Sequence, residues 1–121
     1  MKKVVIVDDE HEILETLTKF LGRSEKYEID TYSNPTLALE SVKRGNYDLV
    51  LLDIMMPQMD GINFLKEVKE VVPKTKVIMM TAFSTEDRLV DCNKFGADDY
   101  VTKPFMSLRD VENKVFDNLG L

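Results

Sequence analysis

Side chains that can bind a cation or a phosphoryl group stand at the ends of short apolar runs. They comprise an acidic pair, a further aspartate, a hydroxyl and an ammonium: Asp8 and Asp9, Asp53, Thr81, and Lys103. Carboxylates that lie together repel one another, which raises at least one of their pKa values, and a hard divalent cation relieves the repulsion. Magnesium prefers one or two carboxylates together with waters and phosphate oxygens. The residue types therefore favour a magnesium-dependent phosphoryl site, because an ionised aspartate needs no general base to attack phosphorus.

The apolar runs predict the elements that would position these side chains. Aliphatic and β-branched runs are typical of strands buried on both faces, and they occupy residues 4–7, 27–32 (weaker and alternating), 49–52, 77–80 and 100–101. Amphipathic stretches with helical spacing follow each run, and Asn34-Pro35 and Ser107 provide cap signals for two of them. This alternation predicts an α/β fold with an open five-stranded parallel sheet and helices on both faces. A closed eightfold barrel would need about twice the length.

In such a sheet all of these side chains lie at the carboxyl edge, where open α/β folds place their binding sites. Taken alone, each has an ordinary explanation: an aspartate as a helix cap or turn residue, a threonine bonded to nearby backbone, a lysine in solvent. Their joint occurrence after four strands favours a single shallow cleft.

Size and composition limit the classes of protein. We expect one domain over residues 1–121, with 44% hydrophobic residues forming its core. The net charge of −6, from 16 basic and 22 acidic residues, argues against direct nucleic-acid binding by this chain. Cys92 is the single cysteine, which excludes an internal disulfide, and no apolar stretch is long enough to cross a membrane. We therefore expect a cytoplasmic protein with no membrane contact.

Over essentially its whole length the sequence resembles the receiver domain of response regulators. Four blocks in the family's order and spacing carry the resemblance: residues 7–10 (VDDE), 53–61 (DIMMPQMDG), 81–82 (TA) and 96–105 (GADDYVTKPF). The resemblance implies a flavodoxin-like (βα)₅ fold with strand order 2-1-3-4-5. It also implies a regulatory phosphorelay domain that takes a phosphoryl group from a histidine kinase, and that catalyses only its own phosphorylation and dephosphorylation.

The resemblance also assigns roles at the acidic end of the cleft. Asp53 would be the phosphoacceptor. Asp9 would bind Mg²⁺ directly, Asp8 mainly through water, and Asp53 and the backbone carbonyl of Met55 would complete the protein ligands.

Further roles concern the switch and its partners. Thr81 and Lys103 would contact the phosphoryl oxygens, and the Lys103-Pro104 bond would be cis. Thr81 and Tyr100 would be the residues that move on activation. A downstream partner or output domain would bind the face formed by the fourth helix, fifth strand and fifth helix. Lys114 replaces an arginine often found there, which argues against the dimer of DNA-binding relatives, and we expect a monomer or a weak phosphorylation-dependent dimer.

Two apolar side chains are expected to control how long the phosphoryl group persists. Met55 and Phe83 stand two residues after Asp53 and Thr81, and neither can orient an attacking water by a hydrogen bond. Phe83 could instead merely pack on the fourth helix. For Met55, Met56 and Met59, we favour partial packing against the third helix over an exposed binding surface.

Two other functions fit the sequence less well. A haloacid-dehalogenase-type phosphatase would need a second acid two residues after the nucleophile, where this chain has Met55, and it would need room for a cap domain. A flavodoxin-like cofactor binder would need a Ser/Thr/Gly-rich phosphate loop after the first strand. Here Asp8, Asp9 and Glu10 would repel a phosphate in the absence of a metal. The sequence leaves open whether the domain stands alone or belongs to a longer regulator.

Overall fold

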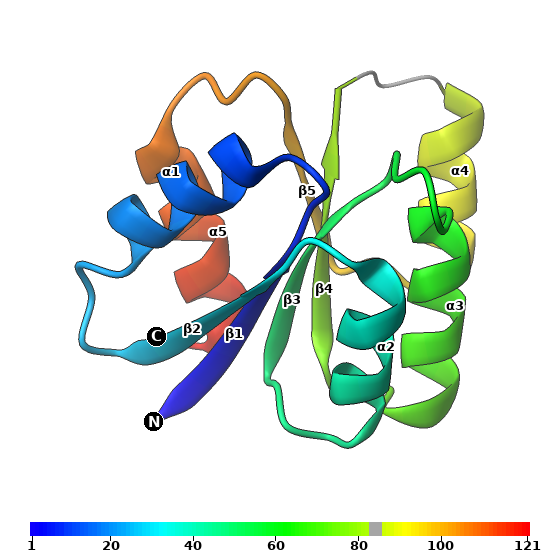
Figure 1. Cartoon of the computed structure of the whole chain (residues 1–121), viewed down its shortest axis with the longest axis horizontal. Helices are drawn as coiled ribbons and strands as arrows, with labels where there is room; N and C mark the ends of the chain where they lie inside the picture. The colour runs from blue at the N-terminus through cyan, green and yellow to red at the C-terminus, as the bar shows by residue number, and fades with distance from the viewer. Residues whose placement is uncertain (83–85) are drawn as a thin grey trace.

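The chain forms one parallel sheet of five strands in the computed structural model, which describes residues 1–82 and 86–121, without the side chains of 86–89. The strands are β1 (Lys2–Val7), β2 (Tyr27–Tyr32), β3 (Leu49–Asp53), β4 (Lys76–Thr81) and β5 (Asp99–Thr102). They are ordered β2-β1-β3-β4-β5, and each neighbouring pair is parallel (Figure 1). The predicted fold class and strand order are confirmed.

Helices cover both faces of this sheet. They are α1 (His11–Leu21), α2 (Pro35–Lys43), α3 (Gly61–Val71), α4 (Glu86–Lys94) and α5 (Leu108–Leu119). Helices α1 and α5 lie on one side, and α2, α3 and α4 lie on the other (Figure 1). Among the described residues, no helix combines the length and the apolar character that crossing a bilayer requires.

The alternation of side chains along the strands divides the apolar core in two. Val4 and Ile6 face the α1–α5 layer, whereas Val5 and Val7 face the α2–α3–α4 layer. The central strands repeat this pattern, and all four of these β1 side chains are fully buried. Strands buried on both faces explain why the apolar runs are continuous rather than alternating.

Polar side chains cap the starts of α2, α3 and α5. The Asn34 side chain accepts hydrogen bonds from the backbone of Thr36 and Leu37 ahead of α2, whose first residue is Pro35. Asp60 caps α3, and Ser107 caps α5 by accepting from the backbone N–H of Asp110. These contacts satisfy donors that the first turn of a helix leaves open, and those at Asn34 and Ser107 confirm the predicted boundaries.

The interior face of α4 differs from the prediction. The helical spacing of Leu89, Val90 and Phe95 in the sequence predicts an apolar stripe that includes Val90. Val90 is nevertheless 60% exposed, while Cys92 is fully buried. Positions two apart in a helix point about 200° apart, that is, to nearly opposite sides, so Val90 turns to solvent and the smaller Cys92 packs against the sheet.

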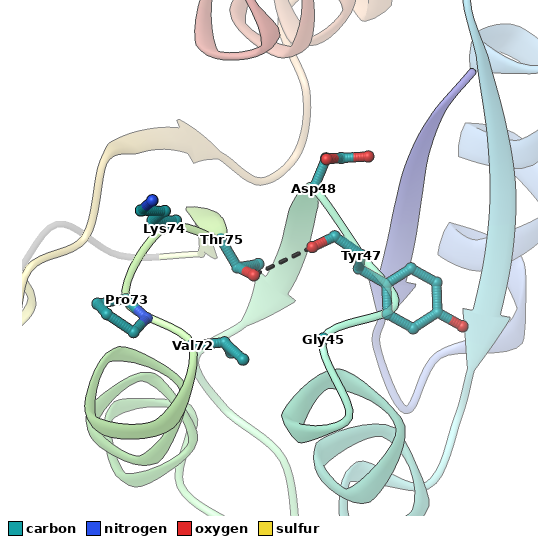
Figure 2. Close-up of a pocket in the computed structure, with 7 residues that line it drawn as sticks. All are labelled: Gly45, Tyr47, Asp48, Val72, Pro73, Lys74 and Thr75. Carbon is teal, nitrogen blue, oxygen red and sulfur yellow. Dashed lines mark hydrogen bonds between the residues drawn. The ribbon is translucent and has the colours of Figure 1, made fainter.

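A pocket of about 390 Å³ lies at the opposite edge of the sheet from the predicted site (Figure 2). It is lined by the loops that enter β3 and β4: Gly45, Tyr47, Asp48, Val72, Pro73, Lys74 and Thr75. The Thr75 hydroxyl donates to the backbone carbonyl of Tyr47 over 3.0 Å and joins the two loops. The pocket therefore lies at the amino ends of β3 and β4, whereas the predicted site lies at their carboxyl ends.

Candidate functional site

Three acidic residues leave the carboxyl end of β1. Asp8 is fully buried, Asp9 is half-buried and Glu10 is exposed. The backbone N–H of Glu10 donates to Asp8 Oδ1 over 2.9 Å, which turns the chain into α1. One oxygen from each of the three carboxylates lies within 4.8 Å of the others. Negative charge is therefore concentrated at this strand end.

Asp53 adds a fourth carboxylate from the neighbouring strand. Val7 pairs with Leu52 in the sheet, so the next residues, Asp8 and Asp53, leave β1 and β3 side by side. Asp53 is only 5% exposed, and its Oδ1 accepts a hydrogen bond from the Met55 backbone over 3.3 Å. The buried carboxylate is thus held by the loop that follows it.

Lys103 brings a cation into this acidic group. Its Nζ lies 2.5 Å from Asp8 Oδ2, 3.5 Å from Asp53 Oδ1 and 3.7 Å from Glu10 Oε1. The side chain is 9% exposed, and the Lys103-Pro104 bond is cis as expected. Residues 95 positions apart in the chain thereby meet.

Thr81 and Tyr100 lie on the same face of the sheet, near this group. Thr81 ends β4 with 5% exposure, and its backbone carbonyl accepts from the Lys103 N–H over 2.7 Å. Thr81 pairs with Thr102, and Tyr100 stands two residues earlier on β5, half-buried against the α2–α3–α4 core. All predicted site residues in the described part of the chain are therefore at or next to the carboxyl edge, and Phe83 lies outside the described residues.

Burial dominates the electrostatics of the two central groups. Burial, together with the charge of Asp8, raises the pKa of Asp53 to about 7, and the charge of Lys103 opposes this only in part. Burial disfavours the charged form of Lys103, but the hydrogen bond to Asp8 and the charge of Asp53 outweigh it, so its pKa is raised. Lys103 therefore stays charged, but its single positive charge does not balance the negative charges of the carboxylates around it.

This imbalance predicts a pH dependence of stability in solutions without divalent cations. Because the pKa of Asp53 rises from 3.8 to about 7 on folding, the folded state binds the proton more tightly. Asp53 therefore contributes stability below its unfolded pKa, and this is lost as pH rises through about 7. Urea unfolding at about pH 4.5 and 7.5 is expected to show that wild type loses about 3 kcal/mol of unfolding free energy relative to Asp53→Asn as the pH rises between these two values. If the difference in unfolding free energy between wild type and Asp53→Asn stayed constant with pH, the raised pKa of Asp53 would be contradicted.

Gly61 fixes the loop that carries Asp53. A Cβ at this position would meet the Asp53 carbonyl oxygen at 2.5 Å and the Ile54 Cα at 2.7 Å, both backbone atoms. The Gly61 N–H donates to the Ile54 carbonyl over 2.9 Å. The start of α3 therefore packs directly on the strand end, which only glycine permits.

Gly61→Ala is accordingly expected to lower the free energy of unfolding by about 1–3 kcal/mol and to displace Asp53. Thermal and urea unfolding measure the first effect. Gly45→Ala is the control, because a Cβ there meets nothing within 4 Å, although its φ of +79° carries a smaller backbone cost. Equal losses in the two variants would show that the close approach at Gly61 adds nothing to the backbone cost of replacing a loop glycine such as Gly45.

The methionines after Asp53 behave differently from one another. Met56 is buried and Met59 is half-buried against the core, as expected. Met55 is 64% exposed, so the prediction that it packs against the third helix is wrong for this residue. Met55 instead borders a pocket of about 380 Å³ with Asp9, Ile54, Met56, Pro57 and Asp60. Met55 thus lies close to Asp9, a position that is compatible with its predicted role in shielding the site from water.

Two contributors to the site were not predicted. Glu10 lies within reach of Lys103, and its place directly after the acidic pair was the available signal. Asn93 accepts a hydrogen bond from the Tyr100 hydroxyl, and no pattern in the sequence indicates that contact.

Comparison with known proteins agrees with this geometry. The family model of the response regulator receiver domain matches residues 4–115. The chain belongs to this family. It is thus the receiver domain of a two-component response regulator, a regulatory class of domain.

Relatives of this receiver domain include transcriptional regulators. It is 38% identical over 117 residues to the nisin biosynthesis regulatory protein NisR of Lactococcus lactis subsp. lactis, covering 97% of this chain and 50% of that protein. It is 42% identical over 113 residues to the transcriptional regulatory protein ResD of Bacillus subtilis, covering 93% and 46%. The chain thus spans about half the length of these relatives.

A solved structure shows the same fold. The CheY-like response regulator receiver domain protein from Methanospirillum hungatei JF-1 superposes with a TM-score of 0.92 at 30% identity, covering 99% of this chain and 94% of that one. The receiver architecture therefore extends over nearly the whole chain.

Proposed function

We propose that this receiver domain accepts a phosphoryl group on Asp53 from a phosphohistidine of a sensor histidine kinase, with Mg²⁺ as cofactor. The observation that carries the proposal is the position of the Lys103 ammonium between the buried carboxylates of Asp8 and Asp53. A buried cation facing a carboxylate nucleophile is the arrangement that phosphoryl transfer needs, because the reaction depends on positioning and charge neutralisation.

The transfer requires little from the protein beyond that arrangement. An ionised Asp53 oxygen forms a bond to phosphorus while the phosphorus–nitrogen bond of the donor breaks, and its electron pair leaves with the imidazole. Lys103 and Thr81 meet the phosphoryl oxygens with an ammonium and a hydroxyl. Later a water oxygen bonds to phosphorus, the Asp53–phosphorus bond breaks, and inorganic phosphate and the free carboxylate result.

The acidic residues fit a hard divalent cation. One carboxylate oxygen from each of Asp8, Asp9 and Glu10 lies within 4.8 Å of the other two, and oxygen is the ligand type that Mg²⁺ prefers. Asp9 and Asp53 would bind the ion directly, the Met55 carbonyl would add a ligand, and Asp8 would act mainly through water. When bound, Mg²⁺ supplies positive charge that offsets the phosphoryl oxygens.

The signal would leave through the face of α4, β5 and α5. Phosphorylation adds negative charge beside Asp53, Thr81 moves towards it, and Tyr100 follows, which is a population shift between two arrangements. The name of NisR extends the proposal to regulation, and the name of ResD to regulation of transcription. A cytoplasmic location of this domain is part of the same proposal.

Acetyl phosphate tests the chemistry without a kinase. Incubation with acetyl phosphate and Mg²⁺ is expected to add the mass of one phosphoryl group to the intact protein, and EDTA is expected to prevent it. Asp9→Ala should need more Mg²⁺ for the same yield, because it removes a ligand and leaves the nucleophile. A full adduct in EDTA would contradict the magnesium requirement.

We also propose that Met55 and Phe83 slow hydrolysis by excluding water from phosphorus. Loaded protein freed of donor is expected to lose phosphate about tenfold faster in the double variant Met55→Asn with Phe83→Ser, which corresponds to about 1.4 kcal/mol in barrier. Met106→Asn is the matched control, since this methionine is 93% exposed and lies in the loop after β5. Equal decay in the double variant and wild type would show that these residues do not set the lifetime.

A further inference from the structure

The backbone of Tyr100 is fixed to α5. The ammonium of Lys114 donates to the Tyr100 carbonyl over 2.5 Å and lies 3.8 Å from the Asp99 carboxylate. The Asn118 amide also donates to Asp99, over 3.1 Å. Two residues of α5 therefore hold β5 at its first two positions, which leaves rotation of the Tyr100 side chain as the available movement.

The ring of Tyr100 is held by α4. Its hydroxyl donates a hydrogen bond to Oδ1 of Asn93, near the end of the helix. Helix α4 begins on the carboxyl side of the sheet and runs back towards the start of β5 (Figure 1). Asn93 therefore anchors the hydroxyl at the end of α4 farther from Thr81 and Asp53.

We infer that Asn93 is a positioning residue that holds the Tyr100 ring away from Thr81 and so opposes the phosphorylated arrangement. The inference rests on the proposed function, in which Tyr100 follows Thr81. A ring that moves along the sheet towards Thr81 must release Asn93, whereas the Lys114 contact to the backbone can persist. The Asn93 hydrogen bond thus stabilises only one of the two ring positions.

Linkage makes the inference measurable. Removing a contact that exists only in the resting arrangement shifts the population towards the arrangement that binds the phosphoryl group better. Asn93→Ala is therefore expected to tighten binding of beryllofluoride, a phosphoryl mimic, by about three- to tenfold, the range of one net hydrogen bond. Asn93→Asp keeps an acceptor oxygen and is expected to stay near the wild-type affinity.

The experiment titrates beryllofluoride in Mg²⁺ into the full chain and follows the Met55 amide resonance, beside Asp53, by NMR. Tyr100→Phe should reproduce the gain of Asn93→Ala, and adding Asn93→Ala to Tyr100→Phe should change nothing further, because the same hydrogen bond is already lost. If the effects of Asn93→Ala and Tyr100→Phe on beryllofluoride affinity were fully additive, or if Asn93→Ala bound with wild-type affinity, the role of Asn93 would be overturned. The proposed function would not be affected by either result. Absence of any binding by the wild type would overturn the proposed function, and the role of Asn93 with it.

Discussion

Replacing Lys103 by methionine is expected to lower the free energy of unfolding by about 3 kcal/mol at neutral pH without divalent cations. The ammonium lies between Asp8 and Asp53, which are 0% and 5% exposed, so its loss leaves two buried carboxylates facing each other. Removing one partner of a buried ion pair is costly because the remaining charge stays desolvated. Urea unfolding monitored by circular dichroism gives the value.

The matched control is Lys19→Met. Lys19 pairs with Glu15 over 3.0 Å on the surface of α1, where both side chains are more than half exposed, and such pairs contribute less than about 1 kcal/mol. Mg²⁺ should restore part of the stability of Lys103→Met, since it offsets the same carboxylates. Equal losses in the two variants would contradict the buried arrangement of Lys103.

The same variant is expected to take up the phosphoryl group from acetyl phosphate about a hundredfold more slowly, because one preorganised charge on the phosphoryl oxygens is missing. The rate is measured by intact mass against time, at a temperature at which circular dichroism shows the variant to be folded. An unchanged rate would remove Lys103 from the proposed chemistry.

The second large effect is expected at Asp53. Asp53→Asn should abolish the phosphoryl adduct, because an amide has nearly the same shape as the carboxylate but lacks the nucleophilic oxygen. The substitution should not unfold the domain, since it removes a charge from a buried position whose pKa is raised to about 7. Loss of the adduct in a protein that is at least as stable as wild type would therefore report chemistry and not misfolding.

The elements of this fold could be predicted because their signals are local. The strand at 27–32 was predicted with its observed bounds, and the polar cap at Asn34 placed the next helix correctly. Continuous aliphatic runs follow from burial on both faces, and the order of elements leaves few topologies. The prediction is wrong for Val90, because an apolar residue in a short helix does not reveal which side of the helix faces the sheet.

The site could be predicted only as a set of residues at one edge. Parallel strands that end together imply that Asp8, Asp53 and Lys103 converge. The distances between them depend on the conformations of the loops after the strands, which the sequence pattern does not give. The close approach of Gly61 to the Asp53 carbonyl and the contact between Asn93 and Tyr100 arise from tertiary packing. Neither has a periodic or capping signal, so only the structure reveals them.

Intact mass after incubation with acetyl phosphate and Mg²⁺, in wild type, Asp53→Asn and Asp60→Asn, tests whether Asp53 is the phosphoacceptor. Asp60 stands in the same loop and caps α3 by accepting from the Ile62 backbone over 2.9 Å, a role that asparagine can also fill. We expect one phosphoryl group on wild type and on Asp60→Asn, and none on Asp53→Asn. A full-yield adduct on Asp53→Asn would contradict the assignment of Asp53 as the phosphoacceptor.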